Sequence, residues 1–599
     1  MGACTGSLQH RNGGVNNRTN RVCSVKISLK AKKSVGVTIA NSEAHLETAD
    51  RRFKMKWWGW GAENVRASLS QSPATLDYLR SRLGLERLEA PSALCLESVR
   101  LPESRLDPSS RERLAAIVGT ANCRFDQRER VLHSVGKGYK DLVRLRQLAL
   151  DQATDVVVYP RGEEEVVAIL ACCRELNLAL VPFGGGTSVV GGLEAEAGGR
   201  RLVVTLDLAY LSRVIEIDAV SQTAIVEAGI FGPALEQQLA ARGFTLGHFP
   251  QSFEFSTLGG WIATRSSGQN SLGYGGIDKL VESLRIVTPE GTIETLHVPR
   301  RGDGPDLTQM LIGSEGAYGI IVAATIRIRP KPESRDYWMY AFKDFGAAID
   351  ASRTLVQSGS RPALLRIADE EETTASLALG HRPGRGGRSI KRRFGQWLLT
   401  RKGFRPPHMV TLLVGLEGSA DQVRRERRIV RRHFSKFNCL SLGGSFGQRW
   451  LATRFELPYL RDELLDNHLL VDTLETATTW SALRDLYRTV RTAIESAAKE
   501  QGEPIIVFTH VSHLYADGAS LYFSLLGRQK RSDPIGQWWA IKRAAGEAIR
   551  AQGAVISHHH GVGMDHRAQT GWSPIERQML MQLKQTLDPT GIMNPGKLL

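Results

Sequence analysis

The sequence predicts an α+β protein, and three observations point to that class. Strand-like and helix-like segments alternate from about residue 151 to 331, which indicates layered sheets and helices. Residues 332–560 mix longer strands with long charged helices. Residues 55–150 are mostly helical in pattern and rich in arginine and leucine. The 599 residues, 42% of them hydrophobic, are enough for several domains with buried cores.

These shifts in pattern divide the chain into five predicted parts. They are a disordered basic segment (1–54), a helical region (55–150), a first α/β domain (151–331), a second α+β domain (332–560) and a C-terminal helical segment (561–599). Residues 1–54 carry ten lysines and arginines against three acidic residues and show no periodicity. A hidden targeting signal, or a start at Met55 with the earlier residues untranslated, are the two alternatives for that segment.

The elements are predicted from periodicity and from end signals. In the first domain they are a strand at 155–159, an amphipathic helix with Val166, Val167, Leu170 and Cys173 on one face, strands at 178–181, 201–207, 214–218 and 223–227, and a helix from Pro233 to before Gly243. In the second they are a strand at 409–416, a helix through Arg431, a helix at 481–499, strands at 505–511 and 519–525, a helix from Asp533 to Gly553 and a short strand to Ser557. Ser573-Pro574-Ile575-Glu576 is a capping box that opens the last helix.

A glycine-rich loop, Pro182-Phe183-Gly184-Gly185-Gly186-Thr187-Ser188, follows the second predicted strand. A Rossmann loop opens a helix, whereas this one runs into Val189-Val190-Gly191-Gly192-Leu193, which starts a helix poorly. Its glycines let backbone N–H groups approach a pyrophosphate, and the two hydroxyls add donors. The loop therefore predicts a dinucleotide-binding site of a non-Rossmann kind, with a plain turn as the alternative.

Composition restricts the partners. Seven scattered cysteines without CxxC spacing indicate a reducing compartment without disulfides or structural zinc. The net charge of +16 is accompanied by no nucleic-acid recognition motif, so an anionic small substrate or an anionic membrane surface is favoured over nucleic acid. Residues 381–405 carry nine lysines and arginines and no acid, with apolar residues at helical spacing. A basic amphipathic helix at a membrane surface and a solvated loop both fit that stretch.

Further motifs identify a family. The segments Pro250–Trp261, Thr264–Gly268 and Ile312–Ile321, together with the ending Asp588–Lys597, resemble the FAD-binding (PCMH-type) domain of the vanillyl-alcohol-oxidase superfamily. The cofactor-binding residues that this resemblance implies are Pro182, Phe183, Gly184, Gly185, Gly186, Thr187, Ser188, Gln251, Ser252, Ser256, Thr257, Thr264, Arg265, Ser266, Ser267, Glu315, Gly316, Ala317, Tyr318, Gly319, Ile320 and Ile321. The expected fold is that domain plus an α+β cap, and the expected cofactor is noncovalent FAD.

Within the superfamily the chain resembles the alkyldihydroxyacetonephosphate synthases, also called alkylglycerone-phosphate synthases. The resemblance extends over nearly all of 55–599, and its motifs are KWWGWG from Lys56, FEFSTLGGW from Phe253, YLRD from Tyr459, DGASLYF from Asp517 and SHHHGVG from Ser557. Gln251 stands where the family has aspartate, and Trp58 where it has asparagine. The first departure weakens one expected cofactor contact.

The candidate catalytic residues are Tyr522, His558, His559 and His560. In a strand at 519–525, Tyr522 falls on the polar face, where its phenol can transfer a proton, and a core-edge tyrosine is the alternative. Adjacent histidines can act as acid and base near neutral pH. We expect no metal site, because consecutive strand residues point to opposite faces, and a solvated loop is the alternative. The family resemblance assigns a phosphate-binding role to Arg461, and a weaker substrate-binding role to Arg366.

The resemblance implies a transferase of ether lipid synthesis. A fatty alcohol replaces the acyl group of a long-chain acyl-dihydroxyacetone phosphate, with flavin as a covalent carrier and no net redox change. One rival is an FAD-dependent D-2-hydroxyacid dehydrogenase. The metal-binding motif of those enzymes is incomplete here, because its asparagine and its second histidine are missing and His559 stands at its glutamate position. A non-enzymatic flavin-binding or lipid-binding protein is the other. We expect a bacterial-type cytoplasmic protein at the inner membrane surface, and no peroxisomal signal is evident. The oligomeric state is left open, with a homodimer as one alternative.

Overall fold

The computed structural model describes residues 54–65, 73–88, 94–200, 202–379, 399–404 and 408–599, all of them within one unit, Val37–Leu599. Residues 1–53 and most of the basic stretch 381–405, for which disorder and a membrane-surface helix were predicted, lie outside the described residues. No helix among those described is long and apolar enough to cross a bilayer.

The glycine-rich loop belongs to a small sheet. Its strands, in spatial order, are β1 (Cys123–Arg124), β2 (Val156–Val158), β4 (Val203–Asp207) and β3 (Ala179–Phe183). β2 and β3 run parallel to β4, and α6 (Glu163–Glu175) connects β2 to β3. The helix buries Val166, Leu170 and Cys173 as predicted, but Val167 is 45% exposed. The glycine loop thus follows the carboxyl end of β3, where ligands of parallel sheets commonly bind.

An antiparallel sheet completes the first domain. Its spatial order is β5 (Val214–Asp218), β6 (Thr223–Glu227), β10 (Ile320–Arg327), β8 (Val281–Thr288) and β9 (Gly291–Glu294). The accompanying elements are α7 (Gly232–Ala240), α8 (Leu258–Ala263), α9 (Ser271–Tyr274), α10 (Ile277–Leu280), α11 (Leu307–Leu311), and the two-stranded sheet of β7 (Phe244–Thr245) and β11 (Arg329–Pro330). One apolar core joins this sheet to the first one.

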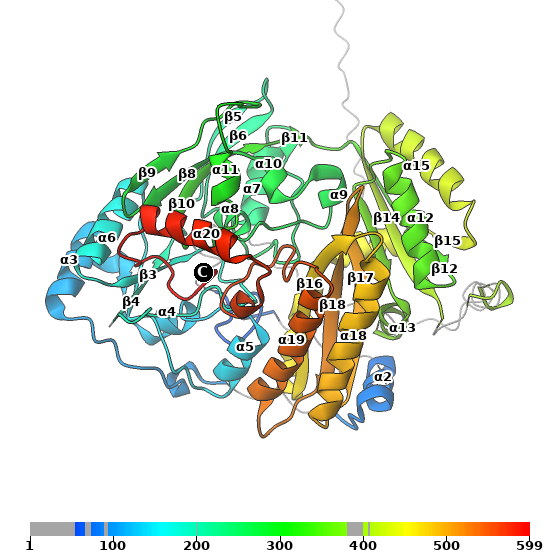
Figure 1. Cartoon of the computed structure of the whole chain (residues 1–599), viewed down its shortest axis with the longest axis horizontal. Helices are drawn as coiled ribbons and strands as arrows, with labels where there is room; N and C mark the ends of the chain where they lie inside the picture. Colours follow the sequence, from blue (N-terminus) through cyan, green and yellow to red (C-terminus); the bar gives the residue numbers. More distant parts are fainter. Residues whose placement is uncertain (1–53, 66–72, 89–93, 201, 380–398, 405–407) are drawn as a thin grey trace, which may run out of the picture. The chain divides into compact units, whose positions relative to one another are not determined.

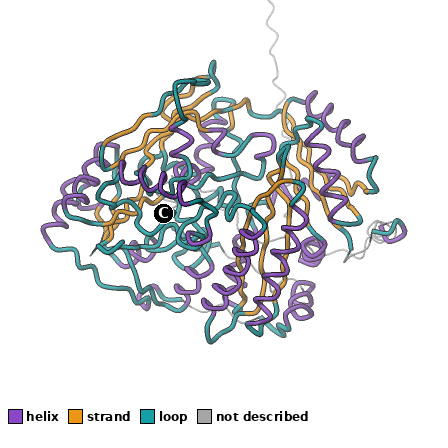
Figure 2. The backbone as a smooth tube through the Cα atoms, viewed as in Figure 1, coloured by secondary structure: helices purple, strands orange, loops and turns teal. Residues whose placement is uncertain are grey.

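The second domain is built on a seven-stranded antiparallel sheet (Figures 1 and 2). Its spatial order is β15 (Cys439–Gly443), β12 (Ser334–Phe342), β14 (Val410–Gly418), β13 (Leu364–Ala368), β17 (Ile505–Leu514), β18 (Gly518–Arg528) and β16 (Leu469–Thr479). One face packs against α12 (Phe345–Gln357), α15 (Ala420–Phe434), α18 (Leu483–Glu500) and α19 (Pro534–Ala551). Other helices of this domain are α13 (Glu370–Leu379), α16 (Gly444–Thr453) and α17 (Leu457–Asp466).

The described part of residues 55–150 and the C-terminal tail are integrated into the cores of the two domains. In residues 55–150 the helices are α2 (Pro73–Leu83), α3 (Pro108–Val118), α4 (Gln127–Leu132) and α5 (Tyr139–Arg146). β1 joins the first sheet, α2 packs against α13, and α5 contributes to the core of the second domain. After α20 (Pro574–Leu587), the tail returns Ile592 and Met593 to the first core, where Met593 bridges Leu180.

One predicted element is wrong in a way that matters for the site. A strand was expected to end at Ser557, but among the described residues this segment makes only an isolated bridge, Val555 to Ala477, followed by turns. The histidines after it therefore lie on a loop, where consecutive side chains do not have to alternate between faces.

Candidate functional site

Tyr522 lies on the face of the seven-stranded sheet opposite the packed helices, as the alternation in β18 predicted. Its neighbours Ala519, Leu521, Phe523 and Leu525 are buried in the helix-covered core. On the other face, Tyr522 pairs with Glu475 of β16 on one side and with His510 of β17 on the other. Three polar residues thus form one row across neighbouring strands.

Aromatic rings surround Tyr522. The His510 ring stacks on it with centroids 4.7 Å apart, and the His560 ring meets it edge-on at 5.5 Å. Burial, together with the nearby Glu475 carboxylate, raises the pKa of Tyr522 to about 12. Burial and the neighbouring His559 lower the pKa of His560 to about 3. At neutral pH the phenol therefore keeps its proton, and the His560 imidazole is neutral.

Glu475 holds the histidine loop (residues 557–563) in place. Its carboxylate accepts backbone N–H bonds from His558 at 2.6 Å and from His559 and His560 at 2.9 Å, and the Ser557 hydroxyl at 2.7 Å. Burial alone would raise the pKa of Glu475, but the adjacent imidazoles, His559 first, hold it well below its usual value. Glu475 was not predicted from the sequence, although acidic residues inside a predominantly leucine and threonine segment were the available signal.

The loop brings His558 and His559 together, contrary to the geometry on which the expected absence of a metal site was based. Their Nδ1 atoms are 3.0 Å apart, and the His513 ring of β17 lies 5.1 Å from His558 and 4.8 Å from His559. Burial and His559 lower the pKa of His558 to about 4, and that of His513 falls well below its usual value for the same reasons. No pattern in the sequence pointed to His513.

Arg461, on α17, presents a partly unpaired guanidinium. Nη1 donates to the carbonyl of Lys137 at 2.7 Å, while Nε and Nη2 are buried without a hydrogen-bond partner. Burial lowers the pKa of Arg461, and Tyr522 is among the groups that interact with its charge. A buried cation with two unused donors close to Tyr522 is suited to an anionic group such as phosphate.

Arg366, in contrast, is already paired. Its Nη2 donates to the Glu372 carboxylate and lies 3.0 Å from Nδ1 of His510. The second oxygen of Glu372 is 3.2 Å from the same His510 nitrogen. Arg366 therefore contacts the ring that stacks on Tyr522, and its charge is balanced by Glu372.

The neighbouring motifs have structural roles. Asp462, next to Arg461, forms a buried ion pair with Lys56 at 2.9 Å and accepts the backbone N–H of Trp60 at 3.0 Å. The KWWGWG segment is thereby fixed against α17. Lys137, whose carbonyl receives Arg461, donates its ammonium to the carbonyl of Lys56 at 3.0 Å.

The glycine-rich loop leaves no room for side chains. A Cβ on Gly185 would lie 1.9 Å from the Phe255 carbonyl oxygen, and one on Gly184 would lie 2.5 Å from Oγ1 of Thr257. Gly186 has a φ of +70°, which a residue with a side chain rarely adopts. The Ser188 hydroxyl accepts the backbone N–H of Gly192 at 3.2 Å, so it shapes the loop.

Several predicted cofactor residues bond to the protein itself. The Glu315 carboxylate accepts the backbone N–H groups of Val562 at 2.6 Å and Gly563 at 2.7 Å, and burial raises its pKa to about 7. Arg265 donates to the carbonyl of Ile312, and Gln251 donates to the carbonyl of Arg454 at 2.7 Å. These side chains link segments around the cofactor site.

Buried polar atoms without partners indicate where a cofactor fits. The hydroxyls of Ser314 and Tyr318, Nδ1 of His248 and Oδ1 of Asn594 are buried and unbonded within the protein. They lie on segments that border the glycine loop, and leaving them unpaired costs free energy. The phosphates, hydroxyls and ring nitrogens of FAD supply suitable partners, so the residues present fit this cofactor. Sequence analysis missed His248, which also contacts the Ser266 hydroxyl at 3.2 Å.

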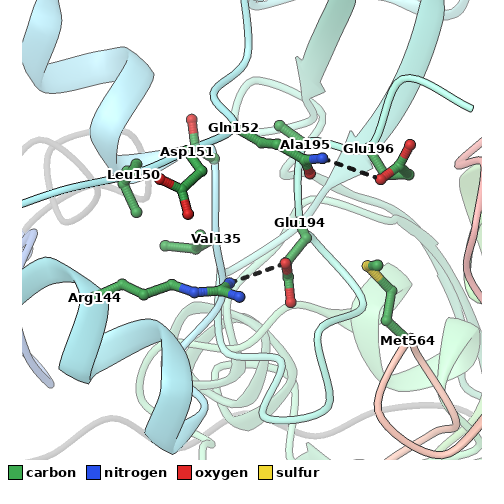
Figure 3. A pocket seen from close by; sticks show the side chains of 10 residues that line it. Val135, Arg144, Leu150, Asp151, Gln152, Glu194, Ala195, Glu196 and Met564 are labelled. Carbon is green, nitrogen blue, oxygen red and sulfur yellow. Dashed lines mark hydrogen bonds and ion pairs between the residues drawn. The ribbon is translucent and has the colours of Figure 1, made fainter. Parts of the chain in front are cut away.

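A cavity of about 240 Å³ is lined by residues that include Arg144, Asp151, Glu194 and Met564 (Figure 3). Arg144 pairs with Glu194 at 3.1 Å at its wall, and Gln152 bonds to Glu196. With Asp151 and two glutamates against one arginine, the lining is acidic and unsuited to a phosphate.

Comparisons with known proteins find two matching domain families and several similar chains. Residues 154–297 match the family "FAD binding domain", and residues 331–598 match "FAD linked oxidases, C-terminal domain". The alkyldihydroxyacetonephosphate synthase of Dictyostelium discoideum is 32% identical over 92% of this chain and 94% of its own length. The enzyme of that name from Trypanosoma brucei brucei is 33% identical over 84% and 82%. A solved alkyldihydroxyacetonephosphate synthase is 30% identical, with a TM-score of 0.79 over 91% of this chain and 98% of its own.

Proposed function

The chain belongs to the alkyldihydroxyacetonephosphate synthase family of FAD enzymes, and we propose that it exchanges the acyl group of acyl-dihydroxyacetone phosphate for a long-chain fatty alcohol. The product is an alkyl-dihydroxyacetone phosphate, the first ether of an ether lipid, and the exchange involves no net redox change. The observation that carries the proposal is the convergence of Tyr522, the histidine loop and the partly unpaired Arg461 on one sheet face.

Arg461 would bind the substrate phosphate. Its two unused N–H donors match two phosphate oxygens, and burial strengthens the attraction because water screens it less. Arg366 would act through His510, whose ring it contacts, rather than by binding phosphate directly. The phosphate then fixes the ketone carbon next to Tyr522.

Tyr522 and the histidines would move the protons. The exchange requires loss of a proton from the carbon beside the ketone and, later, from the fatty alcohol. Tyr522 and the His560 ring, which meet edge-on at 5.5 Å, are the groups placed to take up and return these protons. His559 and His558 support this transfer from the same loop. Bound FAD, held by the glycine loop and the segments around Glu315, supplies the electrophilic centre of the exchange.

Isotope labelling tests this function. Purified FAD-bound protein is incubated with palmitoyl-dihydroxyacetone phosphate and a labelled fatty alcohol, and the products are analysed by mass spectrometry. We expect labelled alkyl-dihydroxyacetone phosphate and free palmitate, and loss of both in Tyr522→Phe with FAD still bound. No ether product, combined with flavin bleaching by a D-2-hydroxyacid in the absence of oxygen, would instead establish the dehydrogenase alternative.

We also propose peripheral association with an anionic membrane surface on the cytoplasmic side. The net charge of +16 supports it, as do the exposed arginines 424, 425, 428, 431 and 432 of α15. Vesicles containing anionic lipid should sediment the protein, and raised salt should release it, whereas neutral vesicles should not bind it. Light scattering on the protein alone, without vesicles, reports whether it is the homodimer that the sequence left open.

A further inference from the structure

Three imidazoles converge where β17 meets the histidine loop. His513, His558 and His559 each offer one ring nitrogen, and these nitrogens all lie within 4.8 Å of one another. Within the part of the chain that the structure describes, no other group of three or more metal-ligating side chains is this close. Imidazole is a good ligand for zinc, copper, nickel and iron, and a poor one for magnesium or calcium.

The backbone at His513 is strained in a way that places its ring in the cluster. Its φ of +49° lies in the left-handed region, which residues with side chains rarely adopt. The pairing of β17 with β18 shifts register between Ser512 and Leu514, so His513 is the extra residue of a β-bulge. Bulges and strained residues of this kind concentrate at functional sites.

Hydroxyl groups orient two of the rings from outside. Ser271 lies 2.7 Å from Nδ1 of His513, and the Tyr515 phenol lies 2.7 Å from Nε2 of His558. Each hydroxyl oxygen can accept the ring N–H, which leaves a lone pair on the other nitrogen of each ring, Nε2 of His513 and Nδ1 of His558. Metal-binding histidines are commonly oriented by such outer partners.

The distances are close to those of a tetrahedral site. Nδ1 of His558 and Nδ1 of His559 are 3.0 Å apart. Two nitrogens bound to one zinc ion at about 2.0–2.1 Å in tetrahedral geometry are separated by about 3.3–3.4 Å. This pair needs only small ring rotations, and the His513 ring moves closer to complete the site, since the three nitrogens lie within 4.8 Å of one another. The Glu475 carboxylate, 3.4 Å from Nδ1 of His559, adds a negative charge nearby.

We propose that His513, His558 and His559 bind one divalent cation of the Zn²⁺ class, with a fourth position left open. The metal takes the position of the proton between the two Nδ1 atoms, and His559 carries its one ring proton on Nε2 instead, so that all three imidazoles bind as neutral ligands. The cation then occupies His558 and His559, so transfer activity is inhibited; this consequence, unlike the binding itself, rests on the proposed function.

Metal binding is measured on tag-free, FAD-bound protein after removal of metals with EDTA and dialysis. Titration of Zn²⁺ in competition with a fluorescent chelator should show one equivalent per chain, and Mg²⁺ should not bind. His513→Gln should lower Zn²⁺ affinity at least about tenfold, and Ser271→Ala, which removes only an outer partner, should lower it in the same direction. His297→Gln, at an exposed histidine outside the cluster, should bind like wild type.

Absence of stoichiometric Zn²⁺ binding by wild type, or wild-type affinity in both variants with FAD retained, overturns the proposal. Zn²⁺ should also inhibit ether formation in wild type at lower concentration than in His513→Gln, each relative to its own rate in EDTA. Ether formation in EDTA reports on the proposed function separately. Ether formation without Zn²⁺ binding would refute only the proposed metal site. Zn²⁺ binding without ether formation would refute only the proposed transferase function.

Discussion

Glu475 is the residue on which the position of the three histidines depends, because three backbone N–H groups and one hydroxyl end on its carboxylate. Glu475→Gln keeps the shape but turns an amide N–H₂ toward donors, which leaves about 2 kcal/mol of hydrogen bonding unmade. We expect kcat to fall at least about tenfold while KM and bound FAD stay near wild type. Steady-state kinetics checks this, with the exposed Glu547→Gln as the control. A rise in KM as large as the expected fall in kcat would contradict a positioning role for Glu475.

The proposed role of Arg461 depends on the geometry of its guanidinium N–H donors. Lysine keeps the charge but replaces the planar fork by a single ammonium, so Arg461→Lys tests whether two N–H groups engage the phosphate. We expect KM for the acyl substrate to rise roughly tenfold, equivalent to about 1.4 kcal/mol, with smaller change in kcat. Arg488→Lys, at an exposed site on α18, should leave both constants unchanged. An unchanged KM in Arg461→Lys would place the phosphate elsewhere.

At the scale of elements, sequence alternation predicted β18 and the polar face of Tyr522 because one strand face had to enter the core. The partners of Tyr522 could not be predicted in this way. Glu475 comes beside it from β16, which α18 and β17 separate from β18 in the sequence. His510 comes beside it through the register of the β17–β18 hairpin, and His513 joins through a bulge. The same limit explains the wrong strand before His558. A local sequence pattern does not show that Glu475, which is distant in the sequence, accepts three backbone N–H groups and holds this segment as a loop.

Glu315 joins two elements, since its carboxylate accepts N–H groups from the histidine loop. Burial raises its pKa to about 7, above the roughly 4.3 of an unfolded glutamate. The folded state therefore binds the proton more tightly, so the resulting stabilisation is present below pH 4.3 and is lost as pH rises through 7. Between pH 5 and 8, the melting temperature of wild type should fall more steeply than that of Glu315→Gln. Parallel curves from differential scanning fluorimetry would contradict the assignment.

At the scale of the whole molecule, the last residues close the cofactor site formed by much earlier ones. Asn594 donates its side-chain N–H₂ to the carbonyl of Gly192, beyond the glycine loop, at 3.2 Å, and to that of Glu315 at 2.7 Å. Its Oδ1 remains buried and unpaired within the protein. One amide thus connects three segments that border the proposed FAD site.

Asn594→Ala removes this donor from the buried carbonyl of Glu315, at a cost of about 1–3 kcal/mol, and from the partly buried carbonyl of Gly192, at a smaller cost. Because both carbonyls belong to segments around the cofactor, part of that loss should be measured as weaker FAD binding, at least about tenfold. Equilibrium dialysis with flavin fluorescence gives the dissociation constant. Gln585→Ala removes an exposed amide that bonds to the carbonyl of Pro589 in the same tail, and should leave FAD affinity unchanged. If both variants bind FAD like wild type, the tail stabilises the fold without shaping the cofactor site.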